Sequence, residues 1–393
     1  MTIDFQQVQA QVKELGKHAS EKQKERSRNL EQARELLQVY SQEAEALRQK
    51  VQSIKDPSLR CALPINPEIA QPEALNASHS LPELPQVATL LAADGSQINH
   101  DRHAEVEYSL VNVGAIKMIL GEVSPPTPYL QSQLFYDEQL DYQTEAILAL
   151  NRDLKERALL VELAANTTPP IITLTDGPVE LWGLPGVSPE ETSAYQKSLD
   201  EYLEVLDRLY RLGAITAGYV DKPAANLVVR LLEIASAEPA DLANLRNYRP
   251  LRGASDRHLF RDILQPGERS AIFELQSSAS KHYLDHLRLH FFYLNVGRED
   301  HPWLARVEAP AWVALDSAKL DILHAVLVDQ CRILGVRPYP YLLHRAHETA
   351  RVSIEERHQV TNMIVLELRR QGIFVEGISN KQFSKDQPGR TRL

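Results

Sequence analysis

Two short apolar segments of the sequence each end on an aspartate that is followed by glycine. Residues 87–93 lead to Asp94-Gly95, and residues 171–175 lead to Asp176-Gly177. Apolar runs of this length, rich in small and β-branched residues, are typical of buried strands. Polar groups at the ends of such strands are frequent functional groups in α/β proteins. Each pair, taken alone, is also typical of a simple Asp-Gly turn.

The repetition of the pattern favours chemistry over two unrelated turns. Two neighbouring carboxylates repel each other unless a cation or a proton lies between them, and hard divalent cations prefer oxygen ligands. The pair therefore predicts half of a metal site. A third strand, expected over residues 215–220, ends at Asp221 before Pro223. Asp221 is either an extra ligand or a helix N-cap ahead of a proline, and we favour the cap.

The composition of the chain argues for a globular protein and against several other classes. The chain has 393 residues, 43% of them hydrophobic, which allows two or three domains with full cores. It contains neither an apolar run of membrane-spanning length nor a signal-peptide pattern, so we expect a cytoplasmic protein without a membrane span. Cys61 and Cys331 lack the spacing of a disulfide framework or a zinc site. The net charge of -10 argues against non-specific coating of nucleic acid, but not against a nuclease with a basic channel.

Changes in composition predict four segments. Residues 1–60 are expected to form a helical arm, either a long helix or a helical hairpin, with a break or a solvent-spanning segment in the polar stretch between Gly16 and Arg28. Residues 61–86 are a proline-rich connector without regular structure. Residues 87–375 form the main domain, with a charged insertion at 235–270 whose arginines face either a phosphate backbone or solvent. Residues 376–393 are a basic tail.

The order of elements in the main domain predicts an α/β fold. Alternating residues over 104–116 predict a hairpin antiparallel to the first strand. A helix over about 136–165, the strand that ends at Asp176 and a helix over 189–212 follow. A mixed sheet flanked by helices accommodates this order. The same order is the layout of ribonuclease-H-like nucleases, in which carboxylates gather around two metal ions and act in phosphoryl displacement.

The chain resembles the NurA family of DNA-end-processing nucleases over residues 88–375. The likeness is carried, in the family's order, by Ala93-Asp94-Gly95-Ser96, Thr175-Asp176-Gly177-Pro178, Gly218-Tyr219-Val220-Asp221-Lys222-Pro223, Arg306-Val307-Glu308-Ala309-Pro310, and Tyr339-Pro340-Tyr341-Leu342 with Ala346-His347. The resemblance implies a ribonuclease-H-like fold and a nuclease that uses Mn²⁺ or Mg²⁺, with two ions expected. It also implies a homodimer, linear or single-stranded DNA as the substrate, and a hexameric HerA-type ATPase as partner.

The resemblance assigns roles to single residues. Asp94 and Asp176 would be metal ligands, and His347 would bind metal or steady the scissile phosphate. A helical carboxylate should complete the catalytic set. Glu162 fits the short gap before the strand of Asp176, and Glu156 is the alternative.

Other residues have weaker assignments. Tyr339 or Tyr341 could bind a phosphate, although a tyrosine beside proline is also typical of packing. His344 is expected to be a surface residue, although its spacing from His347 allows a metal pair. Arg306 and Glu308 are expected to form ion pairs in a dimer or a channel.

Two functions follow. The first is a metal-dependent deoxyribonuclease, an exonuclease that could also be a single-strand endonuclease, resecting ends in double-strand-break repair. The alternative is a catalytically inactive scaffold that binds DNA ends or the ATPase.

Overall fold

The computed structural model describes residues 3–101, 106–136, 144–181 and 189–373. The chain divides into two compact units. The first unit comprises Met1–Leu84 and Gly218–Tyr339, and the second comprises Pro85–Ala217 and Pro340–Leu393. Strand β7 (Ile215–Val220) contributes residues to both. The predicted domain boundaries follow changes in composition along the chain, whereas these two units follow the contacts between residues. The predicted boundaries therefore stay predictions.

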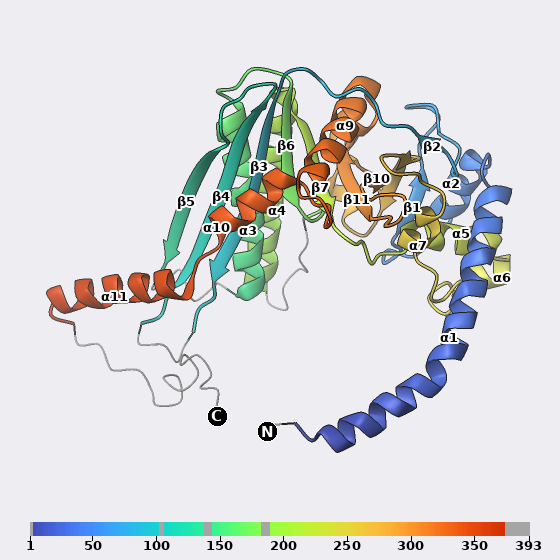
Figure 1. Cartoon of the computed structure of the whole chain (residues 1–393), viewed down its shortest axis with the longest axis horizontal. Coiled ribbons are helices and arrows are strands. Elements are labelled where there is room, and N and C mark those ends of the chain that lie inside the picture. The colour runs from blue at the N-terminus through green and yellow to red at the C-terminus, as the bar shows by residue number, and fades with distance from the viewer. Residues whose placement is uncertain (1–2, 102–105, 137–143, 182–188, 374–393) are drawn as a thin grey trace. The chain divides into compact units, whose positions relative to one another are not determined.

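The first unit combines an antiparallel sheet with helices (Figure 1). Its helices are α1 (Phe5–Val39), α2 (Ala44–Gln52), α5 (Leu227–Ser236), α6 (Pro239–Leu242), α7 (Asp256–Arg261), α8 (Ala311–Ala314) and α9 (Ser317–Ile333), with 3-10 turns at Ser280–His282 and Asp285–Leu287. Its strands are β1 (Cys61–Pro64), β2 (Ser78–His79), β8 (Arg269–Ser270), β9 (Phe273–Gln276), β10 (Leu289–Asn295) and β11 (Leu304–Pro310).

The core of the first unit is aromatic. Phe273 and Phe291 from adjacent strands stack with ring centroids 5.6 Å apart, and Phe260 of α7 stacks on Tyr293 at 4.8 Å. The strands lie in the order β1-β9-β10-β11-β7, and the short strand β8 pairs with both β2 and β10. Large aromatic residues at alternate strand positions thus bind the sheet to its helices.

The second unit holds both Asp-Gly pairs. Its strands are β3 (Ala88–Ile98), β4 (Ser109–Leu120), β5 (Thr127–Phe135), β6 (Ile171–Asp176) and the first part of β7, and its helices are α3 (Glu145–Ala164), α4 (Pro189–Arg211), α10 (Tyr341–Ala350) and α11 (Ile354–Arg370). The strands lie in the order β5-β4-β3-β6-β7. β3 pairs antiparallel with β4 and parallel with β6. This mixed sheet confirms the predicted ribonuclease-H-like fold class.

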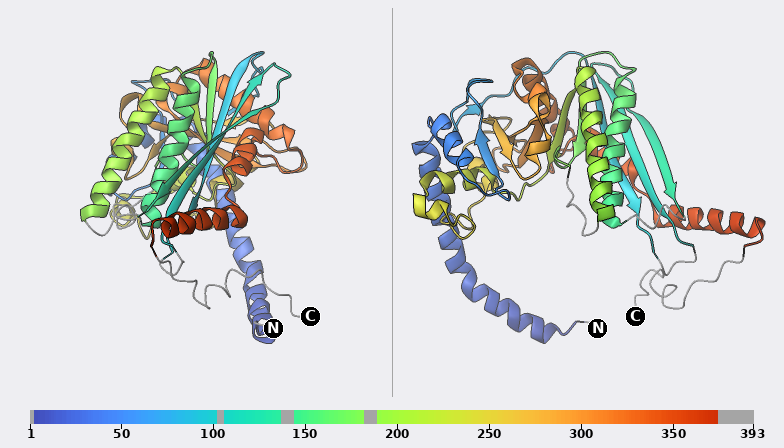
Figure 2. Two further views of the ribbon diagram at one scale, coloured as in Figure 1. Left: turned by 90° about the vertical axis from the view of Figure 1, so that its left-hand side faces the viewer. Right: turned by 180° about the vertical axis from the view of Figure 1, so that it is seen from behind.

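Helices cover both faces of the sheet in the second unit. α3 and α4 lie on one face, and α10 crosses the other (Figures 1 and 2). On the α3 face, Leu91 and Ala93 pack with Val111 and Val113 against Leu159 of the helix. Ser353 and Glu356 form a capping box at the start of α11, each side chain accepting the other residue's backbone N–H.

The N-terminal segments agree with one prediction and differ from another. α1 is one long helix that continues through Gly16–Arg28, so of the two alternatives for that stretch the structure shows the solvent-spanning segment and not the break; its Lys, Glu, Gln and Arg residues are good helix formers. The expected irregular connector contains β1 and β2, since tertiary pairing with β9 and β8 overrides the interrupting prolines. The predicted basic tail at 376–393 lies outside the described residues. Within the described ranges, no helix has the length and apolar character to span a membrane.

Candidate metal centre

Asp94 lies inside a strand rather than at its end. The six residues before it are fully buried, and β3 continues beyond it to Ile98 because β4 pairs with the whole strand, with Asp94 opposite Gly114. The prediction that the strand stops at Asp94 is therefore wrong for the antiparallel side. On the other side, the parallel pairing with β6 does end just before it, at Ala93 and Thr175.

Asp176 is the last residue of β6 and is exposed. Thr175 pairs with Ala93 in the parallel register, and Asp176 and Asp94 are the residues that follow them. Because side chains alternate along strands, the two aspartates start on the same face of the sheet, from strands that lie about 4.8 Å apart. Gly177 then turns the chain with a φ of 86°. The strands thus deliver both carboxylates to one edge of the parallel pairing.

His347 on α10 contacts Asp94 directly. Its Nδ1 lies 2.7 Å from Asp94 Oδ2, and the other carboxylate oxygen of Asp94 accepts the Gly95 N–H at 2.8 Å. The Asp94 side chain is 16% exposed and that of His347 is 64% exposed. The pair is therefore anchored in the sheet on the aspartate side and open to solvent on the histidine side.

Three residues that the sequence did not single out hold α10 against the sheet. Ser96 Oγ and Asn112 Nδ2 both donate to the carbonyl oxygen of Ala350, at 2.5 Å and 2.7 Å, at the C-terminal end of the helix. Gly114 leaves room for the helix, because a Cβ there would lie 2.6 Å from the Ala350 nitrogen. These residues fix the helix one turn after His347. Their partners lie more than 200 residues away along the chain, so local sequence patterns carry no signal for them.

Glu156 on α3 approaches Asp94 from the opposite face of the sheet. A Cβ on Gly95 would lie 2.8 Å from Glu156 Oε1, so the carboxylate rests on the strand backbone next to Asp94. Arg152 Nε lies 3.5 Å from the same oxygen. Burial raises the pKa of Glu156 well above its ordinary value, and the charges of Asp153 and Asp94 add to the effect. A cation nearby would stabilise the ionised form of this carboxylate.

Glu162 lies elsewhere on the same helix. Its side chain is exposed and accepts a hydrogen bond from Gln131 Nε2 of β5 at 2.8 Å. Six residues turn an α-helix by about 600°, so Glu156 and Glu162 point about 120° apart. The structure therefore brings Glu156, and not Glu162, to the strand of Asp94. A signal was present in the sequence: Glu156 precedes Leu160 and Ala164 by one and two turns, on the apolar stripe of the helix.

The donor set suits a hard divalent cation in its chemistry, with carboxylate oxygens and one imidazole nitrogen. Two neighbouring ligands about 2.1 Å from an octahedral cation lie about 3 Å apart, close to the 2.7 Å between Asp94 Oδ2 and His347 Nδ1. These two residues thus fit adjacent positions on one ion. Among the residues that the structure describes, no group of three or more His, Cys, Asp or Glu side chains is arranged to hold a metal ion.

Asp221 has a different partner from the one expected. It belongs to the first unit and accepts a hydrogen bond from Trp303 Nε1 at 2.7 Å, while Lys222 lies over the ring of Trp303 at 4.2 Å. It is not a helix cap, because α5 begins only at Leu227. The first three backbone N–H groups of that helix donate to Asp256 instead.

The structure also shows the surroundings of the three other predicted residues, two tyrosines and a histidine. The ring of Tyr339, in the first unit, meets Tyr219 edge-on at 5.6 Å. Tyr341 is the first residue of α10, in the second unit. His344 lies 3.6 Å from Glu348 in an exposed pair on the same helix.

Arg306 and Glu308 form an ion pair with each other within β11, in the core of the first unit and not in the dimer interface or channel that was expected. Arg306 donates to Glu308 Oε1 from Nε at 3.0 Å, and both side chains are buried in the first unit.

Fold and site together define a ribonuclease-H-like α/β protein with an Asp–His pair at the end of its parallel strands. The NurA domain matches residues 88–352, and the chain belongs to the NurA family. A search of curated protein sequences found no match.

Several solved structures are similar to this chain, among them one NurA nuclease and two endonuclease V proteins. The NurA nuclease from Sulfolobus solfataricus aligns at 12% identity with a TM-score of 0.47, covering 75% of this chain and 88% of that one. Ciona intestinalis endonuclease V, in complex with an inosine-containing DNA, aligns at 11% identity with a TM-score of 0.30, covering 70% of this chain and 87% of that one. The catalytic domain of human endonuclease V aligns at 14% identity with a TM-score of 0.32, covering 84% of this chain and 98% of that one. These likenesses are weak, so the family assignment rests on the domain match.

Proposed function

We propose that the protein is a divalent-metal-dependent deoxyribonuclease, with its active centre at Asp94, Asp176, Glu156 and His347. Membership of the NurA family supports nuclease activity. The observation that carries the proposed site is the 2.7 Å contact between Asp94 and His347, beside the buried carboxylate of Glu156. Glu156 replaces Glu162 as the proposed helical carboxylate because it lies at the strand of Asp94.

The residues have separate roles in this proposal. Asp94 and Asp176 would hold the cations, with His347 next to Asp94 and Glu156 reaching the site past Gly95. Bound Mn²⁺ or Mg²⁺, two ions in our proposal, supplies Lewis acidity for hydrolysis of the phosphodiester. The backbone N–H of Gly95 fixes one oxygen of Asp94, so the other oxygen keeps its direction. His347, largely exposed, can orient a phosphate or exchange a proton with solvent.

Positive side chains near the site suit a DNA strand. A cavity of about 520 Å³ in the second unit is lined by Ser96, two residues after Asp94, and by Arg351 and Arg357 after α10. Arginine pairs with phosphate through two parallel hydrogen bonds. We propose that these arginines bind the backbone of the strand that enters the site.

The finer biological role follows from the family resemblance. We propose resection of DNA ends in double-strand-break repair, by an exonuclease that also cleaves single strands, acting as a homodimer with a HerA-type ATPase. A cytoplasmic location is part of the same proposal. Co-purification with the ATPase and the mass of the protein in solution test the two assembly claims separately.

Cleavage of linear and single-stranded DNA by the purified full-length chain tests the activity. With Mn²⁺ or Mg²⁺ we expect cleavage that EDTA abolishes, and Asp94→Ala and Asp176→Ala should lower the rate by about 10³-fold or more, since each removes transition-state charge stabilisation. His344→Ala, which alters an exposed histidine on the same helix, is the matched control. Normal cleavage by both aspartate variants would show that the site is wrong. Absence of cleavage with every divalent metal, together with retained binding of DNA ends or the ATPase, would favour the inactive scaffold.

A further inference from the structure

The first unit contains a cavity of about 670 Å³ whose charged lining is mostly arginine. It lies along α5 and the segment that follows α6, within the charged insertion. Its charged residues are Arg60, Arg230, Glu233, Arg246, Arg249 and Arg252. Five guanidinium groups and one carboxylate thus share a cavity in a chain whose net charge is -10. Its volume lies in the range of about 300–1,000 Å³ typical of small-ligand sites.

A buried ion pair organises this cavity. Arg230 and Glu233 on α5 are 4% and 3% exposed and lie 2.7 Å apart. Arg230 also donates to the carbonyl oxygens of Leu245 and Tyr248, at 2.7 Å and 2.8 Å. The loop between α6 and α7 is therefore fastened to α5 on both sides of Arg246, so the backbone that carries Arg246 is held in place before any ligand arrives.

The single carboxylate of the lining is already neutralised. Glu233 Oε2 accepts hydrogen bonds from both Arg230 and Arg249, the latter at 3.2 Å. The further arginines Arg246 and Arg252 also lie on the lining. The cavity therefore keeps an excess of positive charge.

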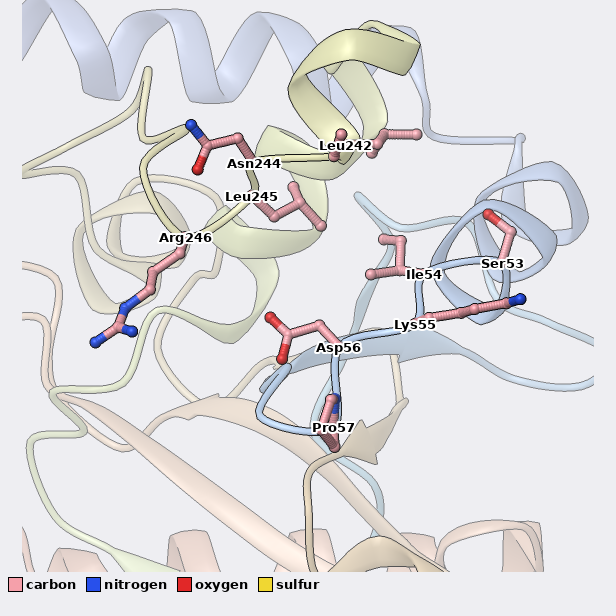
Figure 3. A pocket seen from close by; sticks show the side chains of 10 residues that line it. Ser53, Ile54, Lys55, Asp56, Pro57, Leu242, Asn244, Leu245 and Arg246 are labelled. Carbon is pink, nitrogen blue, oxygen red and sulfur yellow. The ribbon is translucent and has the colours of Figure 1, made fainter.

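Arg246 also lines a neighbouring pocket, where the segment after α2 supplies an acid. Figure 3 shows this pocket, with the guanidinium of Arg246 pointing away from the carboxylate of Asp56. The pKa of Asp56 is lowered first by hydrogen bonds from Ser58, and only then by the charges of Arg230 and Arg246. Asp56 is thus satisfied by Ser58, which leaves Arg246 available to an anion.

We propose that the arginine cavity binds the phosphate group of a nucleotide, carried either by a free mononucleotide or by the end of a DNA strand. A guanidinium group matches phosphate geometry with two parallel hydrogen bonds and keeps its charge at all physiological pH values. Several arginines around one cavity favour a compact, multiply charged group over a single carboxylate. The cavity belongs to the first unit and the proposed metal centre to the second. The proposal of phosphate binding and the proposal of a nuclease site can therefore be tested independently of each other.

Binding measurements on the full-length protein in EDTA test the proposal without cleavage. Isothermal titration with deoxyadenosine monophosphate, and with a short oligonucleotide bearing a 5′-phosphate, provides the two phosphate probes. Deoxyadenosine and the same oligonucleotide with a 5′-hydroxyl are their matched controls. We expect tighter binding of at least one phosphate probe than of its control. Arg246→Ala with Arg252→Ala should weaken it at least about tenfold, the effect of losing one or more charge-assisted hydrogen bonds.

Arg261→Ala is the matched charge control, because Arg261 is an exposed arginine of the same insertion that lies outside the cavity lining. It should leave the affinity unchanged. Binding of the mononucleotide identifies a free nucleotide as ligand, and binding of the 5′-phosphate oligonucleotide alone identifies a strand end. Equal binding of phosphate probes and controls would overturn the proposal. So would a double variant that keeps wild-type affinity, or an equal loss in Arg261→Ala. Thermal unfolding of each variant checks that it is folded.

Discussion

The two Asp-Gly pairs have the same sequence and different surroundings. Asp94-Gly95 lies in a strand that is paired on both sides, with His347 contacting the aspartate and Glu156 resting on the glycine. Asp176-Gly177 ends its strand, and a Cβ on Gly177 would meet nothing within 4 Å. Glycine is needed for space at the first position and for a positive φ at the second.

The comparison separates the contributions of the two pairs to the proposed site. The first pair brings together groups from two helices on opposite faces of the sheet, so changes there should affect both packing and chemistry. The second pair supplies one exposed carboxylate at the end of its strand, immediately before the turn at Gly177. Changes at Gly177 should therefore affect backbone conformation more than the positions of other site residues.

Among changes that leave both aspartates intact, the largest effect should come from the carboxylate that lies over the first pair. Glu156→Gln keeps the shape of the side chain and removes its charge, so we expect cleavage to fall by about 10² to 10³-fold, as for loss of one electrostatic contact in the transition state. Glu162→Gln on the same helix is the matched control and should cleave as the wild type does. Initial rates of DNA cleavage with Mn²⁺ show which of the two glutamates is needed. The reverse result would return the role to Glu162.

Gly95→Ala should have the next largest effect. The added Cβ would lie 2.5 Å from Arg152 Cγ and 2.8 Å from Glu156 Oε1, so the helix or its side chains must move. We expect a loss of about 1–3 kcal/mol in the free energy of unfolding, typical of overpacking, and slower cleavage because Glu156 is displaced. Urea denaturation and initial rates measure both. A variant as stable and active as the wild type would show that Glu156 does not rest on this strand.

Gly177→Ala should have the smallest effect. Its Cβ meets no neighbour, but a φ of 86° is unfavourable for alanine, so we expect a cost of about 1–2 kcal/mol in the free energy of unfolding. Cleavage should fall less than in Gly95→Ala, because Asp176 and its neighbours keep their places. The same two assays measure the difference. A greater loss of cleavage in Gly177→Ala would reverse the comparison.

Much of the fold was predictable from local patterns. The apolar runs before Asp94 and Asp176 predicted two strands correctly, and their order with the hairpin and helix predicted the mixed sheet. The length of β3 was not predictable, because it depends on pairing with β4 rather than on the residues after Gly95. The polar stretch of α1 left a single long helix and a helical hairpin both open, because residues that face solvent on all sides give no apolar stripe from which the path of the helix can be predicted.

The candidate site was less predictable than the fold. The two aspartates follow directly from strand patterns, but the contact of His347 with Asp94 joins residues 253 positions apart. The choice between Glu156 and Glu162 depends on which face of α3 meets the sheet, and the apolar stripe of the helix carried that information. The capping role expected for Asp221 is performed by Asp256, which reaches α5 only through tertiary folding.

Binding of Mn²⁺ to the full-length protein tests the central claim most directly. Electron paramagnetic resonance of free Mn²⁺ during titration gives the affinity of the wild type and of Asp94→Asn and Asp176→Asn, which keep the side-chain shape. We expect saturable binding by the wild type and at least about tenfold weaker binding by each variant, since even residues supporting a ligand change metal affinity by about 10–100-fold. Wild-type affinity in both variants would contradict a metal centre at the two Asp-Gly pairs.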